Sequence, residues 1–175
     1  DFGDALAIDS KGYIYAGGAT GSLDFPVTPD AYDHTPMVQG DDDAFVTKFD
    51  RKLTNVLVST FLGGNKRDAV CSLSMGPGEE VYVAGFTESR NYPITEGAYD
   101  RTYNGAGGYQ DDDIFVSKLD KYLSVLMAST FLGGSYTDRC AAIVIDKQKN
   151  VFVAGRTCSD VGALSDFPTT PGAFD

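Results

Sequence analysis

The chain has 175 residues, of which 25 are acidic and 14 are basic, so its formal net charge is −11. This charge disfavours binding to nucleic acids and to anionic membrane surfaces, because both require basic patches. The sequence has no apolar stretch of about 20 residues, the length that a membrane-spanning helix needs, so we expect no membrane insertion.

Short apolar runs follow one another along the chain, and each has about the length of a β-strand. They are rich in Val, Ile, Phe, Tyr and Thr, and Gly, Pro, Asp or Asn bound them, as is typical of strands. No window of a dozen residues shows helical periodicity. The sequence therefore predicts an all-β fold with strands at residues 5–9, 13–18, 44–49, 56–62, 71–75, 81–86, 114–119 and 125–132, followed by a hairpin at 141–157.

These runs belong to an internal repeat. The hexapeptide Ser-Thr-Phe-Leu-Gly-Gly occupies residues 59–64 and again 129–134, an offset of 70 residues, and residues 41–50 recur at the same offset as 111–120. Two further patterns occur three times each: an apolar pair followed by Ala-Gly, and Ala-aromatic-Asp, which ends at Asp33, Asp100 and Asp175. Self-similarity at a fixed period indicates stacked copies of one supersecondary unit.

Short and long connections alternate within each copy. Tight turns at residues 10–12, 51–55, 121–124 and 147–150 predict antiparallel hairpins, whereas long segments at 20–43 and 87–113 separate the second run from the third. A repeated four-stranded antiparallel unit indicates a β-propeller blade. We expect one blade at 1–64, a second at 65–134 and a partial third at 135–175 with two strands and a long loop. Because a propeller needs at least about four blades, this chain would supply about two and a half blades of a larger ring.

Four motifs in fixed order carry a family resemblance. They are Ala-Ile-Asp-x-x-Gly-x-Ile-Tyr-Ala-Gly at 7–17, Asp-Phe-Pro-x-Thr-Pro-x-Ala-Tyr at 24–32, Asp-Ala-Phe-Val-x-Lys-Phe at 43–49, and Ser-Thr-Phe-Leu-Gly-Gly at 59–64. The chain resembles the SBBP family of bacterial β-propeller repeats over essentially its whole length. The resemblance implies a propeller in a large secreted or cell-surface protein. It implies no catalytic motif, and the inserts at 103–110 and 159–165 depart from the family's usual spacing.

The most distinctive polar features are two runs of three aspartates, 41–43 and 111–113. Calcium prefers oxygen ligands, so Asp41 and Asp43, and likewise Asp111 and Asp113, are candidate calcium ligands, with Asp24 or Asp166 nearby. Consecutive residues of an extended strand point to opposite faces, so three adjacent aspartates cannot all face one ion. The alternative is a solvated acidic start of a strand that discourages edge pairing. Apart from this possible calcium, we expect no cofactor.

Three cysteines are present, and none has the C-x-x-C spacing of zinc or haem sites. Cys71 is expected to be a small buried apolar side chain. Cys140 and Cys158 lie almost symmetrically about the turn near residues 147–150, so either a disulfide across the hairpin or two free thiols is compatible with the sequence.

No catalytic constellation stands out. His34 is the only histidine and lies in a polar loop, and nothing selects a pair of carboxylates for glycoside hydrolysis. The dipeptides Phe25-Pro26, Tyr92-Pro93 and Phe167-Pro168 are expected to pin each long loop onto its blade.

Two classes of function remain. The first is a non-catalytic extracellular scaffold, adhesion or protein- or glycan-binding module, whose partners are the remaining blades, neighbouring subunits or a ligand on the long-loop face. The second is part of a propeller polysaccharide hydrolase or lyase with its active site in the long loops or in other blades. Because the long loops echo one another, the sequence favours the scaffold. The core is predicted to contain Phe45, Val46, Phe49, Leu57 and Phe61, with Phe115, Val116, Leu119, Leu126 and Phe131.

Overall fold

A computed structural model describes residues 1–35, 41–105, 111–158 and 166–173. All regular secondary structure in this part of the chain is β-strand, which confirms the predicted all-β fold. None of the described residues form a helix that could cross a membrane. The strands are β1 (Phe2–Ile8), β2 (Ile14–Thr20), β3 (Asp43–Phe49), β4 (Val56–Phe61), β5 (Asp68–Met75), β6 (Val81–Thr87), β7 (Asp113–Leu119), β8 (Leu126–Leu132), β9 (Asp138–Ile145) and β10 (Val151–Thr157).

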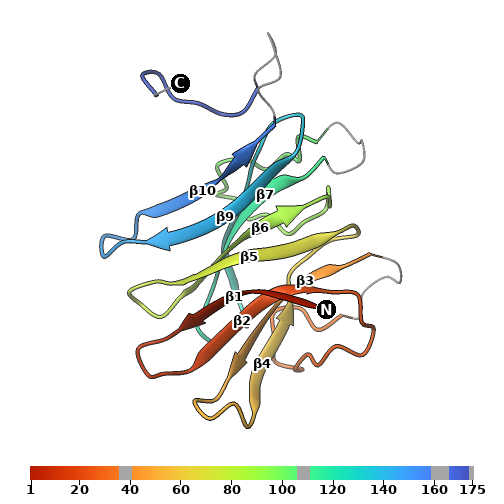
Figure 1. Cartoon of the computed structure of the whole chain (residues 1–175), viewed down its shortest axis with the longest axis vertical. Coiled ribbons are helices and arrows are strands. Elements are labelled where there is room, and N and C mark those ends of the chain that lie inside the picture. The colour runs from red at the N-terminus through yellow and green to blue at the C-terminus, as the bar shows by residue number, and fades with distance from the viewer. Residues whose placement is uncertain (36–40, 106–110, 159–165, 174–175) are drawn as a thin grey trace.

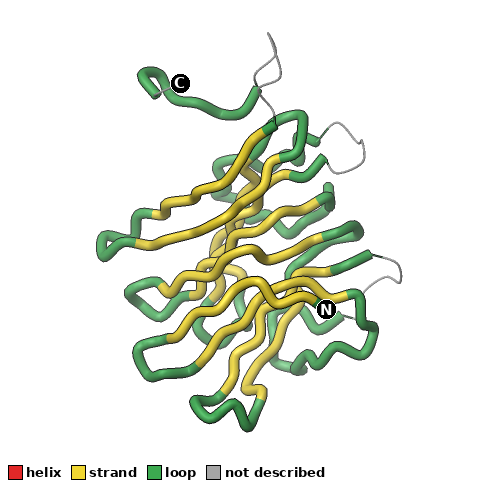
Figure 2. The backbone as a smooth tube through the Cα atoms, in the orientation of Figure 1, coloured by secondary structure: helices red, strands yellow, loops and turns green. Residues whose placement is uncertain are grey.

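The strands form three antiparallel sheets (Figure 2). The first has the order β1-β2-β3-β4, the second β5-β6-β7-β8, and the third contains β9 and β10. Every neighbour in a sheet is also a neighbour in sequence. The short links at residues 9–13, 50–55, 76–80, 120–125 and 146–150 form five antiparallel hairpins, because a short link can only join antiparallel strands, and the long loops connect β2 to β3 and β6 to β7.

Successive sheets pack against one another through their first strands. β5 contacts β1, β2 and β3 of the first sheet, and β9 contacts β5, β6 and β7 of the second. Figure 1 shows β1, β5 and β9 following one another up the stack. In that view the long loops leave the sheets at one end, on the right, and the short turns lie at the other.

The repeated sequences adopt the same strand register. Phe45 pairs with Phe61 in the first sheet, and Phe115 pairs with Phe131 in the second. The irregularity between Lys48 and Phe49 recurs at Lys118 and Leu119. Because side chains alternate between the two faces of a strand, an identical register sends equivalent side chains to equivalent faces.

Aspartates close four of the five short turns, and a residue with positive φ follows each of them. Asp50 accepts hydrogen bonds from the backbone N–H groups of Lys52 (3.1 Å) and Thr54 (2.8 Å), and Asp120 accepts one from Ser124 (2.7 Å). Leu53 (φ 56°) and Leu123 (φ 52°) occupy the left-handed conformation three residues after these aspartates. The aspartate therefore stabilises a turn that L-residues rarely adopt.

The long loops are fastened onto the edge strands β4 and β8. Thr28 and Thr95 bond the backbone of Ser59 and Ser129, respectively, as both donor and acceptor. The Phe25 ring lies 4.5 Å from that of Phe45, and the Tyr92 ring stacks 4.4 Å from that of Phe115 (centroid distances). These two contacts confirm that an aromatic residue before proline pins the loop onto its sheet.

Most of the predicted core residues are buried, with one error. Phe45, Val46, Phe61, Phe115, Leu119 and Phe131 are buried, whereas Phe49, Val116 and Leu126 are half-buried. Leu57 was predicted to be buried but is 45% exposed. It lies in the edge strand β4 at the register irregularity, where Lys48 pairs with Val58 and Phe49 pairs with Val56, so Leu57 is the extra residue of a bulge and does not follow the alternation of its strand.

Truncating Phe131 to alanine is expected to lower the free energy of unfolding by about 3–5 kcal/mol, because a fully buried ring is replaced by a cavity. Phe131 packs in the main core, with its ring centroid 6.1 Å from those of Tyr92 and Tyr103. Urea denaturation measures the loss. Tyr99→Ala, which removes an exposed ring, is the control, and an equal loss in both variants would contradict the assigned core.

Candidate functional site

Carboxyl groups from consecutive sheets converge where β3 and β5 begin. Asp43 opens β3 of the first sheet, and Asp68 opens β5 of the second. A Cβ atom added to Gly63 would lie 2.8 Å from both Asp43 Oδ1 and Asp68 Oδ2. The first glycine of Ser-Thr-Phe-Leu-Gly-Gly therefore provides the space in which the two carboxyl groups meet.

Hydrogen bonds hold Asp68 in this place. The Gly64 N–H (2.7 Å) and the Ser89 hydroxyl (2.9 Å) both donate to Asp68 Oδ2. The backbone N–H of Asp68 donates to the Asp42 carbonyl at 2.8 Å. One residue thus ties the start of the second sheet to the acidic run of the first.

The same junction recurs between the second sheet and the third. A Cβ on Gly133 would lie 2.6 Å from Asp113 Oδ1 and 2.9 Å from Asp138 Oδ2. The Gly134 N–H donates to Asp138 Oδ2 at 2.7 Å, and the Asp138 N–H donates to the Asp112 carbonyl at 2.6 Å. We call these two places the carboxyl junctions: Asp43, Gly63 and Asp68 in the first, Asp113, Gly133 and Asp138 in the second.

The structure separates the predicted calcium ligands within each acidic run. Asp43 and Asp113 lie in the carboxyl junctions, whereas Asp41 forms an ion pair with Lys66 (3.9 Å) and the Asp111 carbonyl accepts a hydrogen bond from Tyr103. The middle residue Asp112 is buried and bonds Arg139. Within the described ranges, no three His, Cys, Asp or Glu side chains are grouped to hold a metal ion. Calcium at these aspartates stays a prediction.

Burial raises the pKa of three carboxyl groups in the junctions, those of Asp43, Asp68 and Asp113. The pKa of Asp43 rises to about 6, and those of Asp68 and Asp113 rise to about 7, with loss of hydration as the main cause in each. The charge of Asp43 adds to the effect at Asp68, as the charges of Asp138 and Asp100 do at Asp113. Hydrogen bonds from Thr87, Gly64 and Ser89 oppose it at Asp68. Near neutral pH these groups are therefore partly protonated.

A polar cavity of about 430 Å³ opens beside the second carboxyl junction, at the long-loop end. The exposed Tyr99 lies at this cavity, together with Asp100, Asn104, Gly133, Asp166 and Pro168. Asp100 accepts hydrogen bonds from the Asn104 side chain and the Thr102 N–H, both at 2.8 Å. The walls thus combine an aromatic ring with fixed oxygen acceptors.

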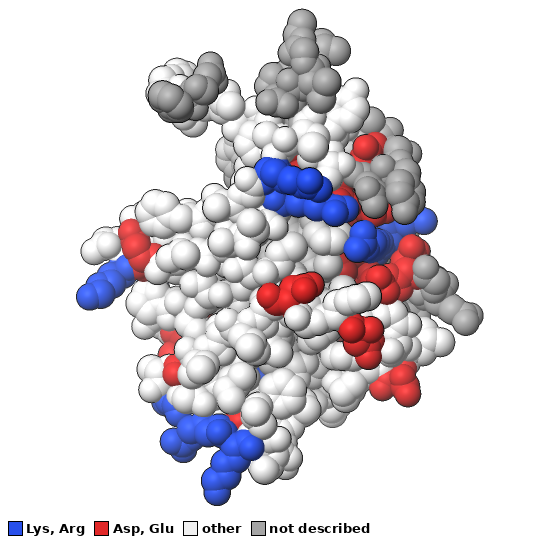
Figure 3. All heavy atoms as spheres, viewed as in Figure 1, with Lys and Arg blue, Asp and Glu red and all other residues white. Residues whose placement is uncertain are grey.

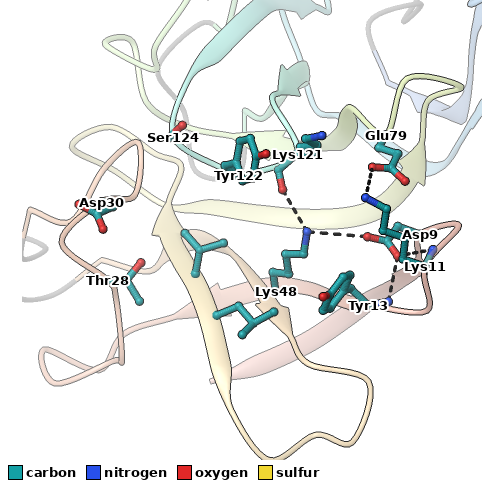
Figure 4. A pocket seen from close by; sticks show the side chains of 12 residues that line it. Asp9, Lys11, Tyr13, Thr28, Asp30, Lys48, Glu79, Lys121, Tyr122 and Ser124 are labelled. Atoms are coloured by element: carbon teal, nitrogen blue, oxygen red, sulfur yellow. Dashed lines mark hydrogen bonds and ion pairs between the residues drawn. The ribbon is translucent and has the colours of Figure 1, made fainter.

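A larger cavity of about 520 Å³ lies at the opposite end, among the short turns (Figure 4). Lys48 reaches into it and lies 3.7 Å from Asp9 and 3.2 Å from the Lys121 carbonyl, as the dashed lines show. Its ammonium group also lies 4.8 Å from the ring centroids of Tyr13 and Tyr15. Burial lowers the pKa of Lys48, and Asp9 opposes this shift. The Lys48 ammonium group thus links the turn that contains Asp9 to the turn that contains Lys121.

The cysteines and the histidine are not grouped with these cavities. Cys71, Cys140 and Cys158 are all free thiols. The strand register places Cys140 opposite Gly155. The Cys158 N–H donates to the carbonyl of Thr137, which lies three residues before Cys140 in the sequence. The two cysteines therefore do not face each other. Burial, and then Cys71, raises the pKa of Cys140 to about 11. His34 is exposed in the first long loop.

Sequence reasoning missed Asp68 and Asp138, although a signal for them exists. The pattern Gly-Gly-x-x-x-Asp occurs at 63–68 and at 133–138. A second pattern, Thr-x-Ser at 20–22 and 87–89, supplies the hydroxyl that bonds the opening aspartate: Ser22 donates to Asp1 as Ser89 donates to Asp68.

Comparison of the chain with models of known protein families and with curated proteins gives no match.

Gly133→Ala is expected to lower the free energy of unfolding by about 1–3 kcal/mol, because its methyl group would collide with Asp113 and Asp138 in a closely packed junction. Thermal unfolding measures the loss. Gly97→Ala is the matched control, since a Cβ there meets nothing within 4 Å. The junction would be wrongly described if both substitutions had the same small effect.

Stability is expected to fall as the pH rises from about 4 to about 7. Burial raises the pKa of Asp113 in the folded protein, so folding favours the protonated carboxyl group, and this contribution is complete below the ordinary pKa and lost as the pH passes about 7. Urea unfolding at pH 5 and pH 8, with EGTA present to remove cations, measures the difference. Asp113→Asn should reduce that difference, while Asp30→Asn in the first long loop should preserve it.

Proposed function

We propose that this chain forms about two and a half blades of a larger β-propeller of the SBBP repeat type, and that it acts as a non-catalytic extracellular or cell-surface binding scaffold. Each four-stranded sheet would be one blade, and β1, β5 and β9 would line the axis of the ring. The observation that supports this proposal best is the repetition of one junction and one register from sheet to sheet.

Equivalent residues in successive turns support an array that continues beyond these sheets. The Leu123 side chain is fully buried in the main core. Its carbonyl accepts a hydrogen bond from the N–H of Tyr32, in the first long loop, at 2.7 Å. Leu53, its counterpart in the first sheet, is 63% exposed. The same side chain therefore fills an interface in one copy and projects into solvent in the other, as expected of a blade that lacks its neighbour.

The long-loop face is the proposed binding surface. Its loops are fastened in the same way to β4 and β8, and the polar cavity beside Tyr99 lies between the second long loop and the segment at 166–168. Figure 3 shows acidic side chains along this side of the molecule, with basic ones among them and a further basic group at the lower left. An exposed aromatic ring beside fixed oxygen acceptors suits a ligand with apolar faces and many hydroxyl groups, such as a glycan.

A hydrolase role has less support from the same cavity. Glycoside hydrolysis requires one carboxyl group to act as an acid and a second as a base or nucleophile. Asp166 accepts hydrogen bonds from Ser135, which lower its pKa, and Asp100 accepts two hydrogen bonds of its own. Asp166 therefore lacks the raised pKa that marks a general acid.

The binding role predicts that Tyr99→Ser weakens glycan binding at least about tenfold, because the cavity loses its aromatic wall. Tyr122→Ser is the matched control, since Tyr122 is also an exposed tyrosine but lies at the turn end. Affinities would be measured on a glycan array and then by calorimetry with the best ligand. Loss of binding in the Tyr122 variant alone, absence of any glycan binding, or release of reducing sugar by the native chain would each overturn the proposal.

A further inference from the structure

The strand β10 has one open edge. In the first sheet β2 lies between β1 and β3, and in the second β6 lies between β5 and β7. Their counterpart β10 pairs only with β9 in the described part of the chain. Its other edge leaves backbone N–H and C=O groups available to a further strand.

The register shows that β10 is shaped for such a strand. In β5–β6 the irregularity falls between Val70 and Ser72, and in β9–β10 it falls at the equivalent residues Cys140 and Ala142. β10 is therefore aligned as β6 is. In β6, Val81 faces Leu119 and Thr87 faces Asp113 across the ladder to β7. The equivalent positions in β10 are Val151 and Thr157.

The exposure of β10 differs sharply from that of its counterparts. Every residue of β6 is buried, whereas most of β10 is exposed. Phe152 is 59% exposed, although the equivalent Tyr82 is 6% exposed and Tyr15 is fully buried. An exposed apolar strand with an open edge is a site for β-strand addition.

The contacts of β3 and β7 define which strand would fit. Phe115 lies over Gly85, where a Cβ would approach its ring to 2.6 Å, and Gly155 is the corresponding glycine of β10. Lys48 lies 4.8 Å from the ring centroid of Tyr15, and Lys118 lies 5.2 Å from that of Tyr82. At the same position β10 has Phe152, and the lysine of an added strand would lie over its ring.

We propose that the open edge of β10 binds an antiparallel strand of the type Asp-x-Phe-Val-x-Lys-apolar, the sequence shared by β3 and β7. The occupant is a third strand with its hairpin partner, which would complete the blade that β9 and β10 begin. The aspartate lies opposite Thr157, the phenylalanine over Gly155 and the lysine over Phe152. This inference rests on the proposed propeller architecture and adds the partner of one particular edge.

A synthetic peptide of residues 41–64, which carries the β3–β4 hairpin, tests the proposal directly. We expect saturable one-to-one binding in fluorescence anisotropy, and slower amide hydrogen exchange within Val151–Thr157. Exchange within Ile14–Thr20 should not change, because β2 is already paired on both sides. The matched control peptide carries Val46→Pro, which removes an N–H from the middle of the strand and should abolish binding.

A substitution in the chain tests the side-chain contact. Phe152→Ala is expected to weaken peptide binding about fivefold or more, whereas Phe2→Ala should have no effect, since Phe2 is also an exposed phenylalanine but lies in β1. Both side chains are exposed, so neither change should prevent folding. Equal binding of the proline peptide, protection outside β10, or no binding at millimolar peptide would overturn the proposal. Glycan binding through Tyr99 is measured separately, so either hypothesis can fail alone.

Discussion

The attachment of each sheet to the one before it depends on one backbone arrangement. The Gly-Gly-x-x-x-Asp segment leaves the last strand of one sheet and returns as the first strand of the next. Two hydrogen bonds fix this path: the Gly64 N–H donates to the Asp68 carboxyl group, and the Asp68 N–H donates to the Asp42 carbonyl. Because Asp42 belongs to the segment that starts β3, the new sheet is aligned with the interior of the old one. Repetition at Gly134, Asp138 and Asp112 gives the second interface the same geometry.

This arrangement places acidic groups where water is excluded. Two carboxyl groups share the space that a glycine leaves, and loss of hydration disfavours the charged form of Asp113. The acidic runs are therefore not simply solvated strand starts: their third residues, Asp43 and Asp113, are drawn between the sheets, and Asp112 is buried against Arg139. Partial protonation near neutral pH lowers the cost of bringing Asp113 and Asp138 together.

Identical sequence positions meet different surroundings along the stack. Leu123 and Leu53 occupy the same turn conformation, yet only Leu123 has a neighbouring sheet to enter. Tyr15, Tyr82 and Phe152 occupy the same place in their strands, yet only Phe152 is exposed. The repeat thus supplies both surfaces of an interface in every copy, and what a copy buries depends on which neighbours are present.

The sequence by itself determined the all-β class, the order and approximate limits of the strands, and the attachment of the long loops by Phe25 and Tyr92. These features follow from local periodicity, turn residues and the repeat, which depend on short stretches of chain. Only the tertiary structure decided that Asp43 meets Asp68, that Asp41 instead turns to Lys66, and that Leu57 faces outward. Each depends on which strand lies beside another across a distance in sequence, and spacing along the chain does not encode that packing.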